Sequence, residues 1–68
     1  MKLGTKIRKA RERAGCTQQT LADHVGVSRL HITKLEQNKE LPSIYCLEVI
    51  AIFLRMSDIL KALNEILY

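Results

Sequence analysis

The segment from residue 17 to residue 37 most constrains the fold, because its pattern predicts two short helices joined by one tight turn. Each helix has its apolar residues on a single face: Leu21, Ala22 and Val25 on the first, Ile32 and Leu35 on the second. Gly26 stands where the chain must reverse within about three residues, and glycine tolerates the positive φ that such a turn favours. Ser28 follows with a hydroxyl that can cap the second helix. A helix pair of this kind places its second helix in the major groove of DNA.

The remaining sequence predicts three more helices. We expect helices over residues 3–14, 18–25, 29–37 and 44–54, and a fifth from residue 58 to near the C-terminus. Gly15 and Asn38 are suited to end the first and third helices in a left-handed conformation. Thr17, Ser43 and Ser57 are suited to cap the second, fourth and fifth. The sequence therefore predicts a single all-α domain over residues 1–68, with the helix pair as its second and third helices.

Composition supports an intracellular helical domain. The chain of 68 residues is 47% hydrophobic with one Pro and three Gly, which favours a compact fold over disorder. No apolar run reaches the ~18 residues of a membrane span, and no leader segment is recognisable, so we expect a cytoplasmic protein. Cys16 and Cys46 lie outside any metal-binding motif, and we expect reduced thiols and no metal. A disulfide, or a metal site shared with His24 and His31, is the alternative.

Positive charge gathers in the first part of the chain. Residues 1–39 contain nine Lys or Arg against three Asp or Glu, whereas residues 40–68 contain two bases against four acids. The formal net charge of +4 therefore understates the charge of the first part. A basic region that coincides with the helix pair predicts a surface for a polyanion such as nucleic acid.

Several short motifs in order resemble the Cro/phage-repressor (XRE) helix-turn-helix family: Ile7-Arg8-x-x-Arg11, Gly15-x-Thr17-Gln18-x-x-Leu21-Ala22, Gly26-Val27-Ser28, Ile32-x-x-Leu35-Glu36 and Pro42-Ser43. The resemblance implies a compact five-helix, lambda-repressor-like domain of prokaryotic or phage origin, acting at the nucleoid. It also implies a transcription regulator, such as a repressor or a restriction-modification controller, that binds a dyad-symmetric operator as a homodimer. Two positions depart from the family pattern. Thr20 replaces an acidic residue, and Arg55 stands where a glycine commonly ends the fourth helix, so we expect that junction to be either more helical or strained.

The outward positions of the third helix are the candidate base contacts: Arg29, Leu30, Thr33 and Lys34. Arg29 is at the end that enters the groove first, and its planar fork matches O6 and N7 of guanine, a contact worth ~1–3 kcal/mol of discrimination. Lys34 can reach a base or a phosphate. Leu30 is apolar at an outward position, which fits either a thymine methyl group or packing on Arg29.

Candidate phosphate contacts surround this helix: Thr17, Gln18, Gln19, Ser28, His31, Asn38, Lys39, Lys9 and Arg13. The resemblance implies that Gln18 bonds a phosphate and braces the third helix, and that the loop amides of Asn38 and Lys39 clamp the sugar–phosphate chain. Lys9 and Arg13 point away from the apolar stripe of the first helix, and they either flank the DNA backbone or keep the domain soluble. The resemblance also implies a structural salt bridge between Arg11 and Glu36.

The last helix has more apolar residues than docking on a small core requires. Leu60, Leu63 and Leu67 follow the stripe expected to face inward, whereas an adjacent stripe predicts a dimer interface made by Ile59, Leu63 and Ile66 with Phe53. Tyr45 and Tyr68 would border it. The alternative is that the domain buries all of these side chains in its own core.

Other function classes fit the sequence less well. An enzyme is not expected, since no paired carboxylates, nucleophile motif or glycine-rich phosphate loop occurs. We also expect no cofactor, small-molecule ligand or membrane partner. The rival is a protein-interaction or antitoxin-like module on the same scaffold, whose exposed surface would be rich in aromatic residues and poor in bases.

Overall fold

The computed structural model describes residues 2–67, and its regular secondary structure is entirely helical. The helices are α1 (Leu3–Arg13), α2 (Gln18–Val25), α3 (Arg29–Glu36), α4 (Ile44–Phe53) and α5 (Ser57–Leu67). The predicted all-α fold of five helices is confirmed, and each helix boundary falls within one residue of its predicted position. Tyr68, predicted to border a dimer interface, lies outside the described residues.

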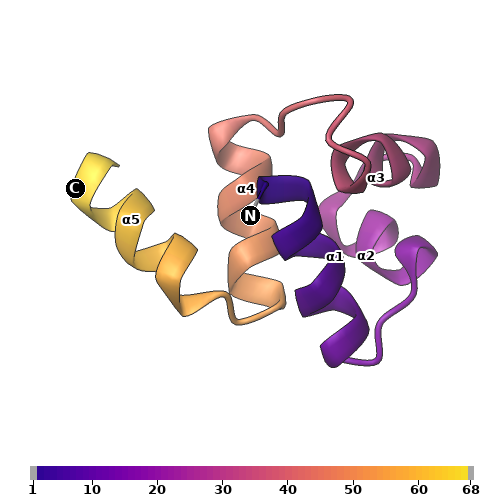
Figure 1. The fold of residues 1–68 in the computed structure, drawn as a ribbon, viewed down its shortest axis with the longest axis horizontal. Coiled ribbons are helices and arrows are strands. Elements are labelled where there is room, and N and C mark those ends of the chain that lie inside the picture. The colour runs from indigo at the N-terminus through magenta and orange to yellow at the C-terminus, as the bar shows by residue number, and fades with distance from the viewer. Residues whose placement is uncertain (1, 68) are drawn as a thin grey trace.

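Helices α1 to α4 enclose the core, and α5 stands at one end of the molecule (Figure 1). The core consists mainly of aliphatic side chains from these four helices and the turn after α4: Ile7, Leu21, Ala22, Ile32, Leu35, Cys46, Ile50, Ala51, Leu54 and Met56. Helix α5 packs against α4 and lies away from α2 and α3. The core therefore holds α3 against α1 and α2.

Hydroxyl caps start three of the helices, as predicted. Thr17, Ser28 and Ser43 each accept a hydrogen bond from the backbone N–H three residues later, at 3.0–3.1 Å. Such a bond satisfies one of the N–H groups that the first helical turn leaves without a partner. The prediction that Ser57 caps α5 is wrong by one position. Ser57 is already helical, because the first hydrogen bond of the helix runs from Leu60 N–H to the carbonyl of Met56 (3.0 Å).

Left-handed residues end the first four helices. Gly15, Gly26 and Asn38 have φ of 70°, 85° and 62°, and Arg55 has φ of 56°. The prediction that Asn38 takes this conformation is confirmed. Of the two alternatives for Arg55, a more helical junction or a strained one, the structure has the strained one, since a left-handed residue with a Cβ costs roughly 1–2 kcal/mol. The turn at Arg55 also places the side chain of Met56 in the core, with only 7% of that residue exposed.

Helix α1 approaches the end of α3 at Gly4. A Cβ at this position would collide with the carbonyl oxygen of Leu35 and lie 2.7 Å from Oδ1 of Asn38. Asn38 Oδ1 accepts a hydrogen bond from Gly4 N–H (2.9 Å), and its Nδ2 donates to Thr5 Oγ1 (3.3 Å). The first turn of α1 is thus capped by a residue 34 positions later, which ties α1 to α3.

Candidate nucleic-acid interface

The outer face of α3 is open to solvent. Ile32 and Leu35 are buried against the core, whereas Arg29 and Leu30 are exposed, with 62% of Leu30 accessible. Arg29, Leu30 and Thr33 line a shallow hollow of about 280 Å³ on this face. The described part of the chain therefore leaves the outer face of α3 uncovered, as insertion into a groove would require.

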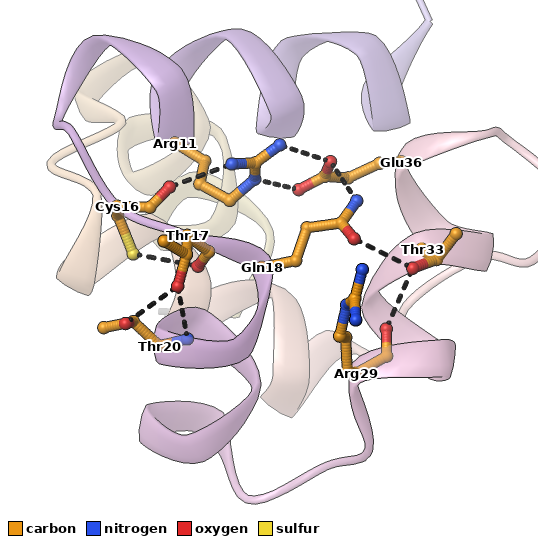
Figure 2. A network of polar contacts seen from close by, with 8 residues as sticks. All are labelled: Arg11, Cys16, Thr17, Gln18, Thr20, Arg29, Thr33 and Glu36. Atoms are coloured by element: carbon orange, nitrogen blue, oxygen red, sulfur yellow. Dashed lines mark hydrogen bonds and ion pairs between the residues drawn. The ribbon is translucent and has the colours of Figure 1, made fainter.

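A network of polar contacts fixes α3 relative to α1 and α2, and Figure 2 shows it from close by. Arg11 donates from Nε to Glu36 Oε2 (2.7 Å) and from Nη2 to Glu36 Oε1 (3.0 Å). Gln18 donates from Nε2 to Glu36 Oε1 (3.1 Å) and accepts from the hydroxyl of Thr33 at its Oε1 (3.0 Å). Gln18 therefore connects the middle and the C-terminal end of α3 to the start of α2. This is the bracing role that the resemblance implied.

The ion pair at the centre of this network is shielded from water. The side chain of Glu36 is 2% exposed and that of Arg11 is 13% exposed. Hydrogen bonding to Glu36 raises the pKa of Arg11 above its usual value, so the guanidinium stays charged. Its Nη1 also donates to the carbonyl of Cys16 (2.9 Å), which holds the loop between α1 and α2. The described residues include no buried side-chain polar atom without a hydrogen-bond partner.

A second hollow, of about 580 Å³, lies where the start of α2 meets the start of α3. Its lining includes four residues that the sequence predicted as DNA contacts and that the fold brings together: Thr17, Gln18, Gln19 and Arg29. The side chains from the start of α2 have partners within the chain: the Thr17 hydroxyl caps α2, and Gln19 donates to Asp23 Oδ1 (2.8 Å). A helix leaves its first N–H groups without intrahelical partners, so the backbone at residues 18 and 19 is the part suited to bind phosphate.

The structure changes the role of the loop amides after α3. Asn38 N–H donates to the carbonyl of Leu35 (3.1 Å), and Lys39 N–H donates to the carbonyl of Lys34 (2.9 Å). These bonds close the left-handed turn that ends the helix. The two amides are therefore not available to clamp a phosphate in the way that was predicted. What Lys39 still offers to DNA is its exposed side chain.

Glu40 is a residue of this surface that sequence reasoning missed. Its Oε2 lies 3.0 Å from His31 Nδ1, and its Oε1 lies 3.7 Å from Lys34 Nζ. The left-handed turn at Asn38 folds the chain back and brings residue 40 beside residues 31 and 34. No local spacing in the sequence signals this approach. A carboxylate thus stands next to two candidate DNA contacts and lowers the positive charge at that end of α3.

Lys9 and Arg13 lie apart from the other candidate contacts. At about 100° per residue, both are about 160° around α1 from Arg11, which points toward α2 and α3. They line a hollow at the turn between α4 and α5, together with Lys6 and Arg55. Ser28 remains beside α3, where its hydroxyl caps the helix by accepting from His31 N–H.

The residues predicted to form the dimer interface differ in exposure: some are wholly or partly buried within the chain and one is open to solvent. Leu63 is buried within the chain at 6% exposure, so its assignment to a dimer surface is wrong, because α5 turns this side chain toward α4. Phe53 stacks on His24, with ring centroids 3.9 Å apart, and Ile59 is half-buried against the core. Ile66 is 73% exposed. Leu67, predicted to face inward, is 42% exposed.

The cysteines are free thiols, with Cys46 buried and Cys16 half-buried. Within residues 2–67, no cluster of His, Cys, Asp or Glu has the arrangement of a metal site. Over the same residues, each helix is too short or too polar to reach across a lipid bilayer.

Comparison with known proteins assigns the family. The helix-turn-helix profile matches residues 7–65, which is most of the chain. The chain belongs to the helix-turn-helix family. Among solved structures, this helix-turn-helix protein is similar to a chain of the SinR protein/SinI protein complex, with a TM-score of 0.76 and 27% sequence identity. The match covers 98% of the present chain and 68% of the chain in that complex. No curated protein matches.

The family and the fold confirm the resemblance to the XRE group and identify a DNA-binding transcription regulator. Members of this family are typically not enzymes. The two hollows beside α3 contain several of the candidate DNA contacts, among them Gln18, Arg29 and Thr33.

Proposed function

We propose that this protein binds double-stranded DNA with sequence specificity, inserting α3 into the major groove of a dyad-symmetric operator to regulate transcription. The main support is the outer face of α3, which is exposed at Arg29 and Leu30 while a buried ion pair holds its other end. A rigid helix with a free basic end loses little freedom on binding, and this favours base readout.

Within this proposal the contacts divide by role. Arg29 reads a guanine, Leu30 meets a thymine methyl group, and Thr33 uses its methyl group, because its hydroxyl is hydrogen-bonded to Gln18. The backbone at the start of α2 binds phosphate, with the side chain of Lys39 following the same strand. Glu40 competes for Lys34 and limits its attraction to phosphate.

The DNA-binding proposal is tested by selecting bound duplexes from a random pool and then measuring affinity at two salt concentrations. We expect Arg29→Ala to weaken the selected site by about 1–3 kcal/mol and random DNA much less. Lys61→Ala is the matched control, because it removes one positive charge on α5, away from α3. Affinity that barely changes with salt would contradict the proposal and favour the protein-interaction alternative.

We further propose that two copies bind together, since one helix per half-site of a dyad operator requires two copies about 34 Å apart. The exposed apolar residues Ile52 (60%) and Ile66 (73%) on α4 and α5 are the candidate contact surface. Sedimentation with and without operator tests this. Ile66→Glu should yield monomers. Ile44→Glu, which changes an exposed isoleucine at the start of α4, the opposite end of that helix from Ile52, should not.

A further inference from the structure

The turn between α4 and α5 and the far side of α1 enclose a cationic hollow that DNA binding does not use. Its volume is about 410 Å³, within the range of small-molecule sites. Four cations line it: Lys6, Lys9, Arg13 and Arg55. We infer that this hollow binds a small phosphate-rich anion, that is, a triphosphate group either free or carried by a nucleotide.

The charges in the hollow are poorly compensated. Asp58 is the acidic residue among its lining residues, and it lies 3.4 Å from Lys6 Nζ. Both side chains of this pair are exposed, at 67% and 40%, so water screens their attraction and an incoming anion can displace it. The hollow is thus lined by three further positive charges, those of Lys9, Arg13 and Arg55. Several like charges around one hollow favour a multivalent anion over a single chloride.

Arg55 provides a separate observation. The described residues have a left-handed residue after each of the first four helices, and three of these positions are glycine or asparagine. Arg55 is the exception, and it borders the hollow. A strained backbone that persists where glycine would be relaxed indicates that the side chain has a use. A guanidinium binds phosphate oxygens through two parallel hydrogen bonds, which a glycine could not provide.

The shape of the hollow agrees with an organic phosphate. Ala10 and the mostly buried Met56 form apolar parts of the lining, between the cations. A base or sugar could rest on these atoms while the phosphates reach the charged rim. This inference departs from the expectation, drawn from the sequence, that no small-molecule ligand binds.

Bound DNA does not account for this cluster. Figure 1 shows the turn between α4 and α5 at the left of α1, with α2 and α3 at its right. Arg11 bonds Glu36 of α3, and Lys9 and Arg13 lie about 160° around α1 from it, so both are on the side of α1 opposite α3. The inference is therefore independent of the proposed operator binding.

Calorimetric titration of the full chain at low salt tests the inference, with sodium triphosphate and adenosine triphosphate as separate probes. We expect both to bind, and Arg55→Gly to weaken them about tenfold or more, as for the loss of a charge-assisted contact that includes at least one hydrogen bond. Glycine suits the left-handed turn, so this variant should fold, which circular dichroism will verify. Lys9→Gln should weaken binding in the same way. Tighter binding of the nucleotide would support contact with Met56, and equal binding would support recognition of the phosphates.

Two control variants decide the location. Lys61→Gln removes one positive charge outside the hollow, and Arg29→Gln removes one at the DNA interface, so both should bind triphosphate nearly as the parent does. No binding by the parent would overturn the inference, and so would equal loss in Lys61→Gln and Arg55→Gly, because net charge would then explain the affinity. A greater loss in Arg29→Gln would place the anion at the DNA interface and would also overturn it. Operator affinity of Arg55→Gly should stay unchanged, which separates this site from DNA binding.

Discussion

Replacing Arg11 by methionine tests the claim that a buried ion pair holds α3 in place. The substitution keeps an unbranched apolar stem of similar length and removes the guanidinium, which donates to both oxygens of Glu36 and to the carbonyl of Cys16. Glu36 would keep one partner, Gln18 Nε2 at 3.1 Å. Because its side chain is 2% exposed, water cannot replace the lost donors.

The expected cost follows from this burial. Removing one partner of a buried pair typically costs about 3–5 kcal/mol, because the other charge stays behind in a poorly hydrated place. A domain of 68 residues has a total stability of roughly 3–10 kcal/mol. We therefore expect Arg11→Met to remove a large part of the free energy of unfolding and to lower Tm by roughly 12–40 °C.

Urea unfolding followed by circular dichroism measures the change in stability. Lys6→Met is the matched control, because Lys6 pairs with Asp58 at the surface and its loss should leave stability unchanged within error. The double variant Arg11→Met/Glu36→Leu should recover much of the loss, since it leaves no unpaired charge. A cost below ~1 kcal/mol for Arg11→Met, abolished by high salt, would refute the reasoning, because it is the behaviour of an exposed pair.

Three further results are expected. Gly4→Ala should destabilise the fold by ~1–3 kcal/mol or more, because its methyl group meets the Leu35 carbonyl, and an unchanged urea midpoint would contradict the close approach. Arg55→Gly should raise stability by ~1 kcal/mol by relieving the left-handed strain, and a lower Tm would count against that strain. Burial raises the pKa of the Cys46 thiol, so Cys16 should react first with a disulfide reagent. For the same reason stability should fall as the pH rises above ~9, where the thiol of the unfolded chain ionises first, and a flat pH profile of the urea midpoint would argue against it.

Much of the fold was predictable because its signals are local. The period of apolar residues placed all five helices, and the hydroxyls of Thr17, Ser28 and Ser43 act within three residues of their own positions. The exception, Ser57, shows the limit of local reasoning. There the first hydrogen bond of α5 uses the carbonyl of Met56, whose side chain is buried in the core, and burial depends on the rest of the molecule.

The candidate site was predictable in part. The outward face of α3 follows from helical spacing, so Arg29 and Leu30 were identified from the sequence and are exposed in the structure. The approach of Glu40 to His31 and Lys34 depends on how the chain folds back after Asn38. No periodicity in the sequence reports it.

Apart from the start of α5, the amino-acid order by itself determined where the helices begin and end, and which of their faces are apolar, because both depend on hydrogen bonds and spacings within a few residues. Only the tertiary structure decided which charged side chains share a space. It separated Lys9 from the proposed DNA interface and placed it with Arg55 around one hollow, and it turned Leu63 into the interior instead of toward a second copy. These outcomes depend on how the helices pack against one another, and that packing is set by all the core contacts together.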